Sequence, residues 1–348
     1  MRVETAIPLN DWRTVAAAAG RAEALGFDGV QSFEIANDPF IPLAFAAIAT
    51  ERVRLGTAIA VCFPRSPMMI ANLSWDLQTQ SKGRFTLGLG TQVKGHNERR
   101  FSVPWSPPLP RLREYVESLR AIWRCWELGE KLDYVGKHYQ FTLMTPEFSP
   151  PPAGLPPIPV TIAAVRPGLM KLAGSVCDGI RLHGFATRKY LEETAIPQIT
   201  AGLETAGRDR SQFEIWGGGF VATGVDEETV RQQIEWVRTR LGFYGSTRSY
   251  HGVFETHGWQ DLGMKLHEMS KTGRWKEMAA EIPDDVLETF TAIGTYKDIG
   301  ARVEERFGGL TDSLTLGLPP EGASDEMREV LQDLKRIPTP FKGFATAW

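Results

Sequence analysis

The chain lacks most features that mark secreted, membrane or nucleic-acid-binding proteins. It has only three cysteines in 348 residues, an odd number spread far apart, which argues against a disulfide framework or a zinc knuckle. No run approaches the roughly 18 apolar residues that a membrane helix needs, and the N-terminus lacks the apolar core of a signal peptide. The charges nearly cancel, at −3, so no global field favours nucleic acid or a membrane. We therefore expect a cytoplasmic protein with no nucleic-acid or membrane partner.

The sequence does contain an alternation of strand-like and helix-like segments from end to end. Short β-branched segments alternate with segments whose apolar residues recur at helical spacing. Eight such strands over more than 300 residues predict an α/β fold, a (β/α)8 TIM barrel, as a single domain over residues 1–338. The expected strands are 2–7, 30–33, 53–60, 84–89, 158–164, 180–183, 213–221 and 312–316.

An open doubly wound sheet is the rival fold. Its support is weak, because Gly88-Leu89-Gly90 is followed by Val93 where a dinucleotide fingerprint has its third glycine.

Two segments depart from the alternation. Residues 241–283 are rich in aromatic side chains and histidine, and predict a C-terminal helical insertion, about 242–290, between strands seven and eight. This insertion is either a lid over an apolar substrate or plain core packing. Residues 339–348 form a C-terminal tail that we expect to be frayed.

The stretch from Pro157 to His183 carries the strongest local signal. It predicts a strand, a tight turn, a helix with Pro167 in its first turn, and a second strand. Free N–H groups and the helix dipole allow such a turn to hold a phosphate. A plain packing turn is the alternative.

The site of a barrel enzyme lies at the C-terminal ends of its strands. After strand four, Lys94, Arg99 and Arg100 bring three cations close to a strand end, which suits an anionic ligand. A solvated loop that pairs with acids such as Glu98 is the alternative.

Three other side chains at strand ends are candidate proton carriers: Glu34, His96 and His183. For Glu34 the alternative is a capping or ion-paired carboxylate, and for His183 it is a structural histidine. No metal-ligand cluster, nucleophile elbow or acidic pair at glycosidase spacing occurs, so the sequence predicts an organic cofactor and no metal.

Several short motifs occur in an order and spacing that are specific when taken together. They are Ala22-Glu-Ala-Leu-Gly-Phe-Asp-Gly-Val30, Asp38-Pro-Phe40, Arg54-Leu-Gly-Thr57, Arg65-Ser-Pro67, Gly83-Arg-Phe-Thr-Leu-Gly-Leu-Gly90, and Leu172-Ala-Gly174 with Asp178-Gly179. In these motifs the chain resembles the luciferase-like flavin and deazaflavin oxidoreductases over nearly its whole length. It is most similar to the branch that uses the deazaflavin coenzyme F420. Three further motifs resemble one subgroup of that branch: Tyr244-Gly-Ser-Thr247, His257-Gly-Trp259 and Arg111-Leu-Arg-Glu-Tyr115.

The resemblance implies that the open end of the barrel holds the deazaflavin. The chain after strand three would bulge within residues 58–61, often through a non-proline cis peptide, and back the ring. The implied cofactor-binding residues lie in this bulge (Ala60, Val61), after strand four (Thr91, Gln92, Lys94, Asn97, Arg99) and in the turn after strand five (Ala164, Val165, Arg166, Gly168, Leu169).

The chain also departs from that family's pattern. Relatives that oxidise sugar phosphates or alcohols tend to carry a histidine after strand two and a glutamate after strand four, where this chain has Glu34 and Gln92 or Val93. Arg166 stands where small residues are common and adds a positive charge near the expected phosphate.

The resemblance implies an F420-dependent oxidoreductase that transfers a hydride between the deazaflavin C5 and a small organic substrate, apolar or aromatic in part, and that forms a homodimer. Two alternatives stay open: an FMN-dependent monooxygenase of the same fold, and a non-catalytic flavin- or deazaflavin-binding protein.

Overall fold

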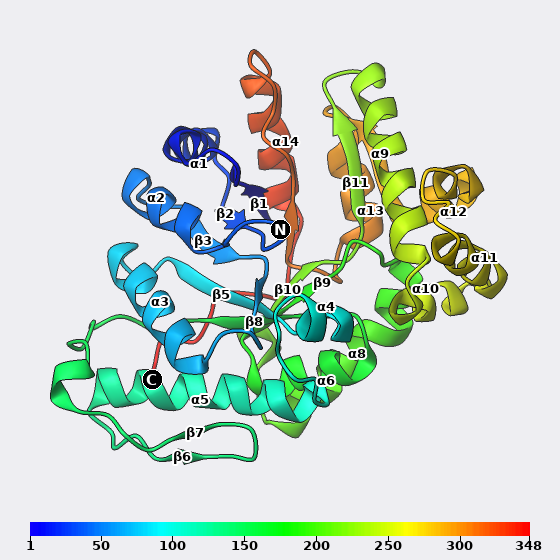
Figure 1. Cartoon of the computed structure of the whole chain (residues 1–348). Coiled ribbons are helices and arrows are strands. Elements are labelled where there is room, and N and C mark those ends of the chain that lie inside the picture. Colours follow the sequence, from blue (N-terminus) through cyan, green and yellow to red (C-terminus); the bar gives the residue numbers. More distant parts are fainter.

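A closed ring of parallel strands forms the centre of the computed structural model, which describes all 348 residues (Figure 1). The barrel strands are β1 (Arg2–Ala6), β2 (Gly29–Ser32), β3 (Arg54–Thr57), β5 (Phe85–Gly90), β8 (Val160–Ala164), β9 (Gly179–Leu182), β10 (Glu214–Gly217) and β13 (Ser313–Thr315). They run in the order β3-β2-β1-β13-β10-β9-β8-β5, and a pairing between β3 and β5 closes the ring. The predicted (β/α)8 barrel is therefore confirmed.

Helices cover the barrel because each buries one apolar face against it. The longest, α5, runs from Pro108 to Leu128; proline suits its first turn, and Gly129 ends it with φ of +70°. The other covering helices are α1 (Val15–Leu25), α2 (Ile41–Ala49), α3 (Pro67–Gln80), α6 (Pro167–Val176), α8 (Ile196–Thr205) and α14 (Ser324–Arg336), whereas α9 (Glu227–Gly245) and α13 (Ile299–Phe307) pack against a small second sheet. None of the chain's helices is both long and apolar enough to cross a bilayer.

Two glycines bring α6 and α8 into close contact. A Cβ at Gly174 would lie 2.4 Å from the carbonyl oxygen of Ile199, and one at Gly202 would lie 2.2 Å from that of Lys171. Only glycine permits backbones to approach this closely. The crossing fixes α6, and with it the turn that precedes this helix.

The third and seventh predicted strands are each wrong, because each is broken in two. Residues 53–60 form β3 and then, after a cis peptide between Ala58 and Ile59, the short strand β4 (Ala60–Val61). This is the bulge that the family resemblance implied. In residues 213–221, Gly217 and Gly218 have φ of +83° and +113°, so the chain turns out of the barrel after β10.

The segment between β10 and β13 contains a small sheet as well as helices. Strand β11 (Phe220–Gly224) pairs in parallel with β12 (Thr291–Thr295), and the sequence predicted neither β12 nor the following α13. Strand β12 was missed because it is short and contains glycine and threonine. The helices between them are α9, α10 (His251–Thr256), α11 (Gln260–Lys271) and α12 (Asp284–Phe290), which lie together beside the barrel in Figure 1.

Phe341 and Trp348 in the last ten residues pack against the core, so the expectation of a frayed tail is wrong for these anchored positions. The backbone N–H of Phe341 donates to Asp312 at 3.1 Å, and the indole N–H of Trp348 donates to the carbonyl of Leu155 at 2.8 Å. Aromatic residues such as Phe341 and Trp348 can hold a chain terminus against the core, so a terminal position alone does not predict disorder.

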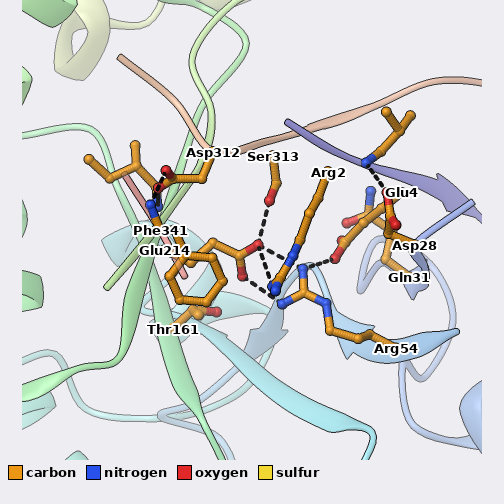
Figure 2. Close-up of polar contacts among 12 residues, drawn as sticks. Arg2, Glu4, Asp28, Gln31, Arg54, Thr161, Glu214, Asp312, Ser313 and Phe341 are labelled. Carbon is orange, nitrogen blue, oxygen red and sulfur yellow. Dashed lines mark hydrogen bonds and ion pairs between the residues drawn. The ribbon is translucent and has the colours of Figure 1, made fainter. Parts of the chain in front are cut away.

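A buried network of charges fills the end of the barrel where the strands begin (Figure 2). The Arg54 guanidinium bonds to both oxygens of Glu214, at 2.7 and 3.0 Å, and to Glu4 at 2.8 Å. Deeper in the barrel, Arg181 donates to Thr161 at 3.1 Å and to Gln31 at 3.2 Å. These side chains close the barrel interior, so a ligand has access only at the opposite end.

Candidate active site

The strand ends selected from the sequence lie together at the end of the barrel opposite this network. Parallel pairing places Val61 beside Gly90, and Ala164 beside Leu182. Because each of these residues lies at the carboxyl end of its strand, the segments that follow begin from one rim. That rim is where the candidate site is built.

The bulge after β3 is held by Glu34 and Arg65. The Val61 backbone N–H donates to Glu34 at 2.6 Å, and Arg65 donates to the two Glu34 oxygens at 2.7 and 2.9 Å. Arg65 also donates to Asp38, at 3.0 Å, and only 6% of the Glu34 side chain is exposed. Glu34 thus holds the Val61 backbone through a hydrogen bond and is itself held by the ion pair with Arg65, while its role in proton transfer stays a prediction.

A short helix, α4 (Lys94–Arg99), occupies the segment after β5 that the sequence suggested was a loop. Asn97 is buried in it, and its amide N–H group donates to the carbonyls of Thr91, at 2.9 Å, and Val93, at 3.2 Å. Gln92 has φ of +56°, and its side-chain oxygen accepts the Val93 N–H. Both side chains therefore shape the backbone of this segment.

The three cations of this segment have separate surroundings. Lys94 lies 3.9 Å from Glu98, whereas Arg100 donates to the carbonyl of Ile35 at 2.7 Å. Arg99 is exposed. Lys94 and Arg99 are therefore the cations of this segment that could reach an anionic ligand.

The turn after β8 leads into α6 with an uncapped helix N-terminus. Arg166 is the N-cap residue, no side chain accepts from the first turn, and Pro167 is the first helical residue. The Arg166 carbonyl accepts the N–H of Leu169 at 3.0 Å, while Arg166 and Gly168 are exposed. An exposed helix N-terminus with an adjacent arginine suits a phosphate.

This turn is anchored on its inner side. Ala164 is buried at the end of β8, and the carbonyl of Val165 accepts the hydroxyl of Tyr190 at 3.0 Å. Tyr190 ends the short helix α7 (Arg188–Tyr190). Tyr190 could not be predicted from the sequence, because only folding brings it into contact with the turn after β8.

His183 lies directly after β9 and is a neutral hydrogen-bond donor. Its Nδ1 accepts the backbone N–H of Phe185 at 2.9 Å, so Nε2 carries the ring proton. Burial lowers the pKa of His183 to about 4, so the ring is uncharged at pH 7. This histidine can donate a hydrogen bond to a ligand, but its lone pair is already engaged. The other predicted histidine, His96, is exposed on α4.

Two tyrosines that the sequence did not select as site residues surround His183. The ring centroids of Tyr244 and Tyr250 lie 4.2 and 4.9 Å from that of His183. The motif Tyr244-Gly-Ser-Thr247 is visible in the sequence, but there it indicates only a subgroup of the family. The fold brings it to the rim of the barrel from a distant segment.

The chemistry of this end suits an organic cofactor. One buried polar atom of α4, Oδ1 of Asn97, has no hydrogen-bond partner in the chain, although buried polar atoms normally have one. Burial raises the pKa of the nearby Cys62 thiol to about 12, so Cys62 is no nucleophile at neutral pH. An unpartnered acceptor and a phosphate turn along one rim fit an extended, partly anionic ring compound.

The sequence profile of the luciferase-like monooxygenase family matches residues 2–313. The chain belongs to this family. It is 42% identical over 336 residues to the uncharacterised protein Rv1360 of Mycobacterium tuberculosis, covering 97% of this chain and 98% of that protein. It is 28% identical over 344 residues to the putative coenzyme F420-dependent oxidoreductase Rv3520c of the same organism, covering 93% of this chain and 94% of the relative.

Solved structures of other luciferase-like proteins share the fold. The coenzyme F420-dependent tetrahydromethanopterin reductase of Methanopyrus kandleri superposes with a TM-score of 0.77 at 21% identity, covering 96% of this chain and 99% of that one. The oxygenating constituent of a Pseudomonas putida 3,6-diketocamphane monooxygenase, solved with FMN, has a TM-score of 0.66 at 14% identity and covers 98% and 99% of the two chains. Proteins with this architecture thus include an F420-dependent enzyme and one that was solved with FMN.

Proposed function

We propose that the protein is an F420-dependent oxidoreductase acting on a small organic substrate. The observation that carries this proposal is the uncapped N-terminus of α6, with Arg166 beside it, on the same rim as the bulge at residues 58–61. The similarity to a putative F420-dependent oxidoreductase over most of both chains supports it. A bound deazaflavin would supply hydride transfer at its C5 carbon.

Each part of the rim has a proposed task. The backbone N–H groups of Val165 and Gly168 would hold the phosphate. The Leu169 N–H already bonds to the Arg166 carbonyl at 3.0 Å, so Leu169 would border the phosphate without donating to it. Arg166, Lys94 and Arg99 would bind the phosphate or the anionic tail. Ala60 and Val61 would back the ring, held in place by Glu34 and Arg65. Thr91, Gln92, Asn97 and Ala164 would line the rest of the ring site.

The rim also excludes water from one side of the ring site. Ala60, Val61 and Ala164 are buried, and the barrel below them is filled by the Arg181 network. A ring held over this floor leaves one face for the substrate, whose orientation would supply the main rate effect.

The direct test is a binding titration of the purified protein with oxidised F420 and with FMN, monitored by cofactor fluorescence. We expect F420 to bind more tightly than FMN, and reduced F420 to be oxidised in the presence of a suitable substrate. Tighter binding of FMN, with oxygen consumption by the reduced flavin, would replace the proposal with a monooxygenase. Binding of F420 without turnover over a broad substrate panel would favour a non-catalytic binding protein.

Reversing the charge of Arg166 is expected to weaken F420 binding. The substitution Arg166→Glu places a carboxylate at the helix N-terminus that the phosphate would occupy, so the dissociation constant should rise about tenfold or more. The matched control is Arg328→Glu on the exposed side of α14, which should leave the dissociation constant unchanged. Equal affinity in wild type and Arg166→Glu would remove this turn from the cofactor site.

We also propose that the protein forms a homodimer through an apolar face. The exposed side of α2 has no charged residue and presents Ile41, Phe45 and Ile48, and the neighbouring α3 adds exposed Met69 and Leu73. A helix that is apolar on all sides is normally covered. A second copy of the same uncharged face would cover it without leaving a charge unpaired.

The substitution Phe45→Asp is expected to convert such a dimer to a monomer. It places a carboxylate within the apolar face, where pairing would bury the charge without a partner. The matched control is Phe148→Asp, which changes an isolated phenylalanine that is 78% exposed. Sedimentation should give twice the mass of one chain for wild type and the control, and the mass of one chain for Phe45→Asp. A monomeric wild type would contradict the proposal.

A further inference from the structure

Three ring side chains with unused hydrogen-bond donors meet at the end of β9. The ring centroids of Tyr244 and Tyr250 are 5.6 Å apart, and both tyrosines contact the His183 ring. All three side chains are partly exposed. Neither tyrosine hydroxyl donates to the chain, and the Nε2 proton of His183 is also unused. The cluster can therefore offer three donors to a bound molecule.

The direction of His183 follows from its strand. Arg181, two residues earlier, points into the barrel, where it contacts Gln31 and Thr161. Side chains two residues apart on a strand lie on the same face. His183 therefore continues the inward-facing row of β9 at the open rim, on the side where a substrate would approach.

The position of Tyr244 is fixed by several contacts. The carbonyls of Gly245 and Ser246, which follow it, accept hydrogen bonds from His251 at 3.0 Å and His267 at 2.9 Å. A carbonyl only accepts, so each histidine presents an N–H here. Gly245 also packs closely, because a Cβ there would lie 2.9 Å from Phe254. The two histidines thus position the turn that presents Tyr244.

The cluster carries no charge. Burial lowers the pKa of His183 to about 4, and burial together with the neighbouring Tyr244 raises the pKa of Tyr250. No lysine, arginine or carboxylate is paired with any of the three rings. A carboxylate or phosphate is normally bound by a cation, as at Arg166, whereas neutral donors between flat rings suit a carbonyl oxygen on a planar apolar body.

We propose that Tyr244, Tyr250 and His183 form the substrate-binding wall, and that the substrate is an uncharged carbonyl compound with a flat, apolar or aromatic body. This inference rests on the proposed function only in taking the open rim as the place of reaction. The motif Tyr244-Gly-Ser-Thr247, which lies between β10 and β13 and is not part of the proposed cofactor site, thereby gains a role.

The test compares two probes of the same size, acetophenone and benzoate, by saturation-transfer NMR and calorimetry, on the protein without cofactor and with F420. We expect acetophenone to bind and benzoate to bind at least about tenfold more weakly, because its carboxylate would be desolvated without a cation. Tyr244→Phe and Tyr250→Phe should each weaken acetophenone binding about fivefold to tenfold, as expected for the loss of one hydrogen bond. The matched control is Tyr134→Phe, which removes a hydroxyl that donates to Glu117 on α5. This variant should bind acetophenone as tightly as wild type does.

The outcomes separate this inference from the proposed function. Equal binding of the two probes, no binding of acetophenone, or unchanged acetophenone binding in both tyrosine variants would overturn the substrate wall, even if F420 binds. Failure of F420 to bind, with acetophenone binding that depends on the tyrosines, would support the wall and reject the F420 proposal. Circular dichroism of the variants shows whether they are folded.

Discussion

Replacing Gly88 by alanine is expected to abolish the folded barrel. A Cβ at this position on β5 would lie 2.0 Å from the carbonyl oxygen of Thr57 and 2.9 Å from Nε of Arg181. The first contact is with the backbone of β3, the strand whose pairing with β5 closes the barrel, so no side-chain rotation relieves it. Overpacking usually costs about 1–3 kcal/mol, and a backbone collision of this kind should exceed that range.

The measurement is urea denaturation of Gly88→Ala, or recovery in the soluble fraction where the variant does not fold. The matched control is Gly252→Ala on α10, where a Cβ would have no atom within 4 Å. Alanine is the better helix former, so this control should be as stable as wild type or slightly more stable. A Gly88→Ala variant with wild-type stability would show that the interior around Arg181 is not as tightly filled as the structure indicates.

Removing Arg54 is expected to cost about 3–5 kcal/mol of unfolding free energy, the range found when one partner of a buried ion pair is deleted. The substitution Arg54→Met leaves Glu214 and Glu4 buried without the guanidinium that now bonds to both. The matched control, Arg328→Met, breaks an exposed ion pair with Asp325 and should cost less than about 1 kcal/mol.

The effect of Arg54→Met should also depend on pH. Burial alone would raise the pKa of Glu214, but the Arg54 guanidinium lowers it to about 2, against an ordinary value of 4.5. A depressed carboxylate pKa stabilises the fold above the unfolded value, and this stabilisation is lost as the pH falls from 4.5 towards 2. The difference between wild type and Arg54→Met should therefore be largest near pH 7 and shrink below pH 4.5. A difference that does not change with pH would show that the variant acts through lost packing.

These two stability predictions concern the filled interior of the barrel, whereas the proposed cofactor and substrate contacts lie at its open rim. The separation has a practical use, because substitutions such as Arg166→Glu and Tyr244→Phe alter exposed or partly exposed groups and should leave the barrel folded. Loss of F420 binding in Arg166→Glu, or of acetophenone binding in Tyr244→Phe, would then reflect a change at the site and not unfolding of the barrel.

The fold class and the position of the rim could be predicted from local patterns along the chain. Buried strands and amphipathic helices follow from hydrophobic periodicity, which is a local property of the chain, and the proline at the start of α6 is a local signal as well. The parallel strands of a barrel all end on one side. The predicted strand ends therefore place Glu34, Thr91, Val165 and His183 at the same rim. The family resemblance added the bulge at residues 58–61.

The chemical properties of these residues could not be predicted in this way, because they depend on contacts that exist only in the folded protein. Glu34 became an ion-paired support because Arg65 folds back onto it, and His183 became a neutral donor because its surroundings bury it and the Phe185 N–H occupies Nδ1. Tyr244 and Tyr250 joined the rim from a segment that is distant in sequence and that contains the unpredicted pairing of β11 with β12. The charge state and the contacts of a side chain depend on residues that folding brings close to it. The hydrophobic periodicity of the sequence contains no information about which residues those are.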